Sequence, residues 1–575
     1  MTEPCAKFRL SAGVSRRAIL SGLAGTTALL ALPAGLWAHV PASSPVFRHG
    51  VASGDPDATS VVLWTRVTHQ GAAEVAWELA ETAAFDPVLR RGIAATGPER
   101  DHTVKVLAEG LAPGRTYYYR FRLGDAWSPV GRTRTLPQGR LDRLGIALAS
   151  CSNYAFGFFN AYDAIARDAD VDFVLHTGDY IYEYGADEWG GPVAHTIDRV
   201  HAPANEIVSL ADYRTRHAQY KTDAGSRAMH AAHPLLACWD DHESANDPWI
   251  GGAENHQPAK EGDWAARRAA SIQAYYEWMP IREPAPGRTR AQFWRGYSFG
   301  DLATLHTLET LHTARARQID YLAHATTITS KDAAAKFRRD VLGEPGRRLL
   351  APELEADLEV ALAASVKAGQ PWRLIGNPMV IARCDVPDLA ALGLVPDPYP
   401  ALATATLADL ARAAESPATI LAWKGHWNLP FYPDTWDGYP WARERLYALS
   451  RRVGAGDLVF LSGDSHSFWA NRLKDDAGRP AGIEIGTAGI SSPGDFIDSG
   501  FAPDTARKLD AAFAEHVPEI VWTDNMHQGY VRIELERERG LASFIGVDTV
   551  LSPDYRTFTI RRAPFARQGA SVDFT

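Results

Sequence analysis

Cysteine is scarce in this chain, with four residues among 575. They are spaced too far apart for a zinc ribbon or a disulfide framework, and they lie at Cys5, Cys151, Cys238 and Cys384. We interpret the segment that holds Cys5 as a leader, which leaves an odd number of cysteines in the mature chain. At least one thiol is therefore expected to be free, and a free thiol in an exported protein calls for a specific role.

An excess of basic residues is also absent. The chain has 59 Lys and Arg against 69 Asp and Glu, a formal net charge of −10. This balance disfavours a general nucleic-acid binder, which usually presents a basic surface. It does not disfavour phosphate chemistry, because bound metal ions can supply positive charge locally. The hydrophobic fraction of 46% and the charged fraction of 22% are typical of a soluble globular protein, and the length predicts a few domains.

Long hydrophobic runs are lacking beyond the N-terminus, where a membrane span would need about 18 consecutive apolar residues. Near the start, Arg16-Arg17 precedes a weakly hydrophobic run from Leu20 to Trp37, with small residues near Ala34 and Ala38. This order predicts a twin-arginine signal peptide over residues 1–38 and not an anchor helix. We expect the twin-arginine export machinery as a partner and a periplasmic or extracellular location. That route carries folded proteins, which suits a cofactor loaded before export.

Residues 45–137 are predicted to form a β-sandwich. Ser60–Val67, Val75–Leu79 and Thr116–Arg122 are rich in strand-forming residues and are separated by Pro and Gly turns. The run that starts at Leu111 and reads Leu-x-Pro-Gly-x-x-Tyr-x-Tyr resembles the fibronectin type III corner, in which a tyrosine hydroxyl bonds to a turn. We interpret this module as a scaffold, because it holds no catalytic constellation.

The pattern changes after about residue 143. A strand over Gly145–Ala149, a helix over Gly157–Ala166 and a strand over Val171–Thr177 predict a parallel βαβ unit. Further strands and helices alternate after it, which indicates a layered α/β or α+β domain. The strands are expected at Pro234–Trp239, Leu302–Thr307, Trp372–Ile375, Leu458–Leu461 and Gly482–Gly486, and two helices at Asp263–Trp278 and Pro352–Ala368.

Four of these strands end in potential metal ligands, and ligand sites form at the carboxyl ends of strands in such sheets. Each residue taken alone has an ordinary explanation, such as a turn aspartate, a packed tyrosine or a buried cysteine. Together they are harder to dismiss, because clustered buried polar groups are costly unless they are paired. The candidate metal ligands are Cys151, Asp179, Tyr182, Asp241, Asp464 and His466.

Such a set suits phosphate-ester hydrolysis. Two or more cations about 3.5–4 Å apart neutralise the phosphate and lower the pKa of a bound water. Asp179 is the candidate bridge between ions. A thiolate and a phenolate at one ion favour Fe(III), and an oxygen-rich neighbouring site favours Ca(II), Mn(II) or Mg(II). His242 follows a candidate ligand and is the candidate proton donor to the leaving oxygen.

At these residues the sequence resembles the PhoD-like family of alkaline phosphatases and phosphodiesterases, within the calcineurin-like metallophosphoesterase superfamily. Four blocks carry the resemblance: Cys151, Gly178-Asp179-Tyr180-Ile181-Tyr182, Asp240-Asp241-His242-Glu243 and Gly463-Asp464-Ser465-His466. Further matching stretches begin at Ser53, Leu63, Ala274 and Trp436. Relative to purple phosphatases, cysteine replaces the first aspartate, and aspartate replaces an asparagine and a histidine.

The resemblance implies an N-terminal fibronectin type III-like β-sandwich followed by a four-layer α/β metallophosphoesterase domain over residues 143–555, with a β-sandwich flanked by helices. It implies Fe(III) and one or two Ca(II) ions, with manganese, magnesium or zinc left open. The expected substrates are small phosphate monoesters, diesters or both, and the expected state is a monomer. A phospholipase D-like diesterase is the alternative, and an adhesion protein with a relic site is disfavoured by the intact ligand set.

One departure concerns the block Leu308-Glu309-Thr310-Leu311, where relatives often have arginine last. If that arginine holds phosphate, another cation or a different substrate is required, and His312 and Arg315 are nearby candidates. The middle histidine block of purple phosphatases has no clear counterpart. Asn377, His426 and Asp437 are open alternatives for that place.

Overall fold

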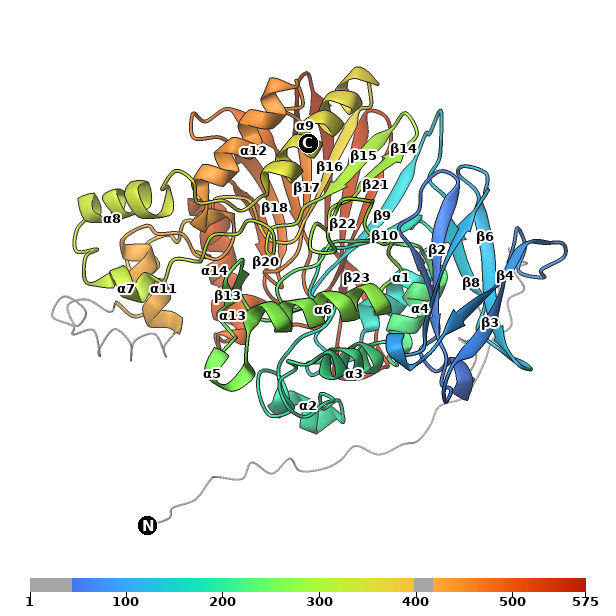
Figure 1. Cartoon of the computed structure of the whole chain (residues 1–575). Coiled ribbons are helices and arrows are strands. Elements are labelled where there is room, and N and C mark those ends of the chain that lie inside the picture. Colours follow the sequence, from blue (N-terminus) through green and yellow to red (C-terminus); the bar gives the residue numbers. More distant parts are fainter. Residues whose placement is uncertain (1–43, 398–416) are drawn as a thin grey trace, which may run out of the picture. The chain divides into compact units, whose positions relative to one another are not determined.

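The computed structural model describes residues 44–397 and 417–575 (Figure 1). The predicted twin-arginine signal over residues 1–38 lies outside the described residues and stays a prediction. Within the described ranges, no helix has the length and apolar character that crossing a membrane requires. The same part of the chain forms sheets of ten, seven, five and two strands.

The N-terminal module has its own hydrophobic core. Tyr117, Tyr119 and Phe121 alternate along one strand and are fully buried, together with Val61 and Leu63 from the facing sheet. One sheet holds β3 (Ala73–Ala80), β4 (Val88–Thr96), β6 (Thr116–Leu123), β7 (Ala126–Trp127) and β8 (Gly131–Arg134), and it faces β1 (Val51–Gly54), β2 (Ser60–Arg66) and β5 (Thr103–Glu109).

A tyrosine joins a turn of this module. The backbone N–H of Ala112 donates to the Tyr117 hydroxyl over 2.8 Å, in the run that resembles the fibronectin type III corner. The fibronectin-like description of the module and the four-layer description of the next domain stay predictions.

The module is joined to the rest of the chain through a shared sheet. β1 pairs in parallel with β11 (Leu235–Ala237) at Gly54 and Leu235, so β1, β2 and β5 form one end of the ten-stranded sheet. The Trp64 indole N–H also donates to the Glu277 carbonyl oxygen over 2.8 Å. Strand alternation in the sequence reports which residues are buried and not which strand is the neighbour, so this continuity was not predicted.

The ten-stranded and seven-stranded sheets pack face to face, and Leu148, Leu175, Leu305, Leu374 and Leu461 are fully buried between them. The ten-stranded sheet continues through β9 (Leu144–Ala149), β10 (Phe173–His176), β21 (Gly529–Leu535), β22 (Arg539–Val547), β23 (Thr557–Gln568) and β24 (Ser571–Phe574). The other comprises β14 (Gly296–Phe299), β15 (Ala303–Thr307), β16 (Trp372–Asn377), β17 (Leu458–Ser462), β18 (Phe468–Lys474), β19 (Pro480–Gly486) and β20 (Ile520–Asp524). β23 and β24 extend the sheet beyond the predicted boundary at residue 555.

Helices pack on the sheet faces that point away from this interior, where they share a second core with Ala147 and Val174 of one sheet and Leu458 and Phe460 of the other. Figure 1 shows α9 and α12 beside β15–β17, and α3 and α6 below the strands. The long helices are α1 (Asn160–Arg167), α3 (Leu210–Tyr220), α4 (Ala224–Ala232), α6 (Trp264–Trp278), α9 (Pro352–Lys367), α11 (Pro417–His426), α12 (Pro440–Arg452) and α14 (Pro503–His516).

Shorter elements lie in the connections. They are α2 (Gly191–Ile197), α5 (Pro258–Glu261), α7 (Tyr321–Ala325), α8 (Lys331–Phe337), α13 (Asp495–Asp498) and the paired β12 (Pro248–Trp249) and β13 (Gly252–Ala253). β9, β10 and β11 run parallel to one another, as do β15, β16, β17 and β19. Their carboxyl ends therefore lie at common edges, and the site is built there.

Candidate metal centre

The predicted ligands lie just beyond the carboxyl ends of four strands. Cys151 follows β9, Asp179 follows β10, Asp241 follows β11, and Asp464 follows β17 of the other sheet. Glycine allows the two sheet ends to approach each other. A Cβ atom at Gly463 would lie 2.2 Å from the Ser150 hydroxyl oxygen and 2.5 Å from that of Thr177, a separation that real side chains do not reach.

The backbone at these positions is strained. Cys151, Asp179, Asp464 and His466 have φ angles of 59°, 54°, 67° and 53°, in the left-handed region that residues other than glycine seldom adopt. Such conformations cost of the order of 1–3 kcal/mol each and concentrate at functional sites. Four of the six predicted ligands share this feature, which favours a functional explanation of the cluster over a purely structural one.

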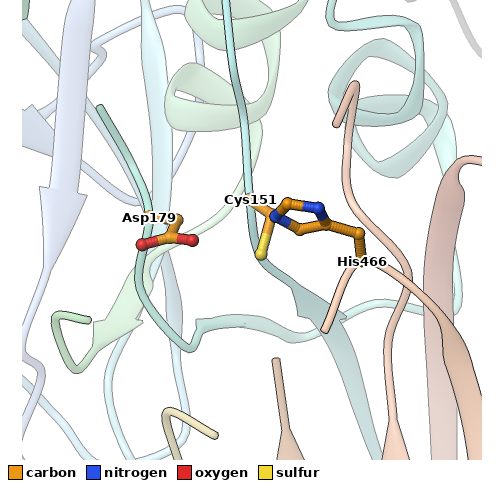
Figure 2. A group of neighbouring side chains, drawn as sticks. All are labelled: Cys151, Asp179 and His466. Atoms are coloured by element: carbon orange, nitrogen blue, oxygen red, sulfur yellow. The ribbon is translucent and has the colours of Figure 1, made fainter. Parts of the chain in front are cut away.

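All six predicted side chains converge. The Cys151 thiol, the Asp179 carboxylate and the His466 imidazole offer donor atoms within 4.8 Å of one another, and they come from separate chain segments (Figure 2). The Tyr182 hydroxyl donates to Asp179 over 3.0 Å and lies 3.2 Å from His466 Nε2. Asp241 belongs to two further groups of the same size: one adds Asp179 and His242, and the other adds Asp240 and Asp464.

Asp240 is a candidate ligand that the sequence analysis missed. It lies in one donor group with Asp241 and Asp464, is 1% exposed, and its Oδ2 atom has no hydrogen-bond partner among the described residues. A buried carboxylate oxygen without a partner is costly unless a cation contacts it. The signal was present in the run Asp240-Asp241-His242-Glu243, but we assigned only one of its two aspartates to metal.

Glu243 has a different role from its neighbours. Its carboxylate accepts hydrogen bonds from the backbone N–H groups of Asp179, Tyr180 and Asp240, at 3.0, 2.6 and 2.8 Å. It therefore fixes the chain after β10 against the chain after β11. This bond network positions Asp179 and leaves Glu243 as a support for the site.

The two histidines differ in the group that contacts their Nδ1 atom. His466 Nδ1 lies 3.1 Å from the Pro493 carbonyl oxygen, which orients Nε2 toward Tyr182 and the other donors. His242 Nδ1 lies 2.7 Å from a Glu183 carboxylate oxygen, and Glu183 also accepts from the Asn246 backbone N–H over 2.7 Å. His466 Nε2 therefore faces the other donor atoms, whereas the His242 ring is paired with the Glu183 carboxylate.

The pKa values follow from this burial and charge. Burial raises the pKa of the Asp179, Asp240 and Asp464 carboxyls well above the ordinary range, and repulsion from neighbouring carboxylates, Asp241 in each case, adds to the shift, while the His242 imidazolium opposes it at Asp179. Burial and the nearby carboxylates also raise the pKa of Cys151 and of Tyr182. The metal-free site therefore retains protons that bound cations would displace.

The imidazole groups shift in opposite directions. Burial lowers the pKa of His466 to about 3, and the His242 charge adds to this. Burial also opposes protonation of His242, but Asp241, Glu183 and Asp179 outweigh it and raise the pKa of His242 well above its ordinary value. Correspondingly, although burial works against its ionisation, the His242 charge and hydrogen bonds lower the pKa of Glu183 to about 2.

The two candidate replacements for the missing arginine do not supply a free cation. Arg315 is 2% exposed and donates to the Tyr439 hydroxyl over 3.3 Å, to the Pro248 carbonyl oxygen over 3.2 Å and to Asp247 over 3.4 Å. Burial lowers the pKa of His312 to about 3, so its ring is neutral. Both side chains are buried, because the loop that carries them packs into the protein interior.

The open alternatives for the middle histidine block are likewise engaged elsewhere. The Asn377 amide donates to the Ser462 hydroxyl over 3.2 Å, and its carbonyl accepts from the Trp436 indole over 3.1 Å. Asp437 accepts from the Cys384 backbone N–H over 2.7 Å and pairs with Arg443 at 2.6 Å. His426 lines a different cavity, beside Lys331 and Trp427. Neither His426 nor Asp437 belongs to the donor groups described above.

Cys151 is free, as predicted, and so are Cys238 and Cys384. Its Sγ atom lies 3.1 Å from the Ser150 hydroxyl and 3.7 Å from the Asp464 carbonyl oxygen. One soft donor, one imidazole and several carboxylates fit a site for more than one cation, with the thiol at one end and oxygen donors at the other.

Comparisons with known proteins agree with the predicted resemblance. The profile of the family described as PhoD-like phosphatase matches residues 146–544, and that of its N-terminal domain matches residues 34–137. Alkaline phosphatase D of Bacillus subtilis is 32% identical over 539 residues, which cover 92% of this chain and 81% of that protein. A solved structure titled "Structure of PhoD" is 29% identical, with a TM-score of 0.72 and 92% of both chains covered.

Proposed function

Because the chain belongs to the PhoD-like phosphatase family, and is therefore a phosphoric ester hydrolase, we propose that it hydrolyses small phosphate mono- and diesters at a centre of two or more metal ions. The observation that carries the metal dependence is the sharing of carboxylates. Asp179 and Asp241 each belong to two adjacent donor groups, the arrangement that a bridged cluster requires. The comparisons do not favour the phospholipase D-like alternative.

We assign Cys151, Tyr182 and His466 to an Fe(III) site and the oxygen donors Asp240 and Asp241 to a Ca(II) site. Asp179 shares one donor group with Cys151 and His466 and another with Asp241, whereas Asp464 lies in one group with Asp240 and Asp241. Thiolate and phenolate ligands suit Fe(III), and a carboxylate-rich site suits Ca(II). When bound, such cations neutralise the phosphate and lower the pKa of a water molecule.

His242 is the proposed proton donor to the leaving oxygen. Its Nδ1 is bound to Glu183, so the proton on Nε2 is the one that is free to move, and Nε2 lies 3.8 Å from Asp241 Oδ1. A His242 ring nitrogen lies within 4.8 Å of donor atoms of Asp179 and Asp241, so His242 can reach an ester held beside those carboxylates. Glu183 positions the ring and maintains its charge, since the neighbouring carboxylates raise the pKa of His242.

The proposed function is tested by removing and restoring the metal. We expect the purified, metal-analysed protein to hydrolyse p-nitrophenyl phosphate or its bis-ester in proportion to its metal content. Chelation should abolish turnover, and Fe(III) with Ca(II) should restore it. Chelated protein that retains full turnover would contradict the proposal.

Reloading of the chelated protein should depend on pH. The metal-free site holds protons, because burial raises the pKa of Cys151, Tyr182 and Asp464, and metal binding must release them. Protons therefore compete with the ions, so ion uptake should be weaker at pH 5 than at pH 8. Uptake measured by metal analysis that is equal at both pH values would show that these groups are not ligands.

A further inference from the structure

Three aromatic side chains, Phe156, Tyr184 and Trp189, are half-buried beside the metal centre, and we name them the aromatic rim. The Trp189 ring lies nearly parallel to the His242 ring, with a centroid distance of 6.2 Å and an interplanar angle of 18°. It is also nearly parallel to the His466 ring, with a centroid distance of 5.7 Å and an interplanar angle of 17°. Phe156 and Tyr184 both lie edge-on to the same indole, with ring-centroid distances of 4.7 Å and 5.6 Å. The flat face of the Trp189 indole therefore adjoins both the proposed proton donor and a proposed ligand, and the other two rings stand edge-on to it.

The position of Trp189 is fixed from two sides. Gly190, with φ of 87°, allows the chain after Trp189 to lie close to Ala155. A Cβ atom at Gly190 would be 2.9 Å from the Ala155 Cβ. On the other side, the Trp189 indole N–H donates to Asp498 at 3.1–3.2 Å, from α13, which follows the Pro493 that orients His466. The indole is therefore held over the site by separate segments, although its ring remains half-exposed.

The exposed carboxylates next to Trp189 add negative charge on the solvent side of the rim. Asp187 and Glu188 precede Trp189 and are exposed, and so is Asp498. Asp187 has His195 as a partner at 2.9 Å. An anionic leaving group, such as a second phosphate or a carboxylate, would be repelled here, whereas a neutral planar group would meet aromatic faces.

We propose that the aromatic rim is the binding site for the leaving group, and that the preferred substrates are phosphate esters whose alcohol carries a neutral planar aromatic ring. This inference rests on the proposed function, in which His242 protonates the leaving oxygen. The departing alcohol then lies beside His242, where Trp189 presents its face. Stacking on that face adds binding for a planar ring that an aliphatic alcohol does not gain. The ring belongs either to an aryl alcohol or to a nucleobase.

The test compares pairs of esters in which one alcohol carries a planar aromatic ring and the other does not. Phenyl phosphate and hexafluoroisopropyl phosphate have leaving alcohols of similar acidity, and adenosine 5′-phosphate and ribose 5-phosphate differ by the base. For each pair, the kcat/KM of the aromatic ester is divided by that of the aliphatic ester. We expect Trp189→Ala to lower this ratio by roughly three- to tenfold for one of the pairs. The pair that responds distinguishes an aryl ring from a nucleobase. Trp189→Phe should keep the ratio.

Trp127→Ala is the matched control for loss of an indole, because Trp127 lies on β7 of the N-terminal module and is 37% exposed. Unchanged kcat/KM ratios for both pairs in a metal-loaded Trp189→Ala protein would overturn the aromatic subsite and leave the proposed function intact. Absence of any hydrolysis by the metal-loaded wild-type protein would contradict the proposed function itself. If Trp189→Ala does not fold, wild-type inhibition decides. Phenylphosphonate or adenosine should bind more tightly than cyclohexylphosphonate or ribose, and equal binding within both pairs would overturn the subsite.

Discussion

Replacement of Asp179 by alanine is expected to remove the bound metal and the hydrolytic activity together. The Asp179 carboxylate belongs to both the Cys151–His466 group and the Asp241–His242 group, so its loss takes one donor from each. It also leaves two cations without the shared negative charge that offsets their repulsion. Turnover should fall by more than roughly 10⁴-fold, since enzymes of this kind supply accelerations of 10⁶ or more that would depend here on the ions.

Metal analysis and turnover of the same preparation measure this effect. Asp504→Ala is a matched control, because the Asp504 side chain is 91% exposed on α14, and it should keep both properties. Asp179→Asn retains the shape of the side chain and should still lose metal, which separates charge from packing. A folded Asp179→Ala protein with its full metal content would exclude Asp179 as a bridging ligand.

The site was largely predictable because its residues follow strands. A buried apolar strand that ends in Gly-Asp or Asp-Asp-His-Glu places its polar groups at a sheet edge, and parallel strands bring such edges together. The structure accordingly gathers Cys151, Asp179 and His466, although His466 lies 287 positions after Asp179 in the sequence. Left-handed backbone at these residues was not predicted, because neither cysteine nor histidine signals it as glycine does.

Other features depend on tertiary contacts that local patterns do not encode. The pairing of β1 with β11 joins the N-terminal module to the main sheet through one strand edge. Trp189 lies in a loop, where no periodicity marks a site residue. Arg315 was a reasonable candidate for phosphate by its place in the sequence, but its guanidinium is buried against the Pro248 carbonyl oxygen and Asp247.

Replacement of His242 by alanine is expected to lower turnover while the metal content stays nearly unchanged. General-acid catalysis contributes about 10²–10⁴-fold, so the rate should fall by that amount for an ester with a poorly acidic leaving alcohol. The loss should be smaller for p-nitrophenyl phosphate, because nitrophenolate departs with little protonation. Turnover of these two esters and metal analysis of each preparation measure the effect.

His516→Ala, at the exposed C-terminal end of α14, is the control for loss of an imidazole. A Glu183→Gln variant should lower turnover in the same ester-dependent way, since Glu183 positions the His242 ring through the 2.7 Å contact. An equal penalty on both esters would rule out proton donation by His242. Loss of metal from His242→Ala would instead make His242 a ligand, which its place in a donor group with Asp179 and Asp241 allows.

The central claim is that these strand-end side chains hold a cluster of catalytic cations, and anomalous diffraction from crystals of the metal-loaded protein tests it most directly. Data collected on both sides of the iron absorption edge should show iron within about 2.0–2.6 Å of Cys151 Sγ, Asp179 and His466 Nε2. A second ion should lie beside Asp241, with Asp179 between the two. Loaded, active crystals with no ion among these side chains, or with ions bound only elsewhere, would contradict the account.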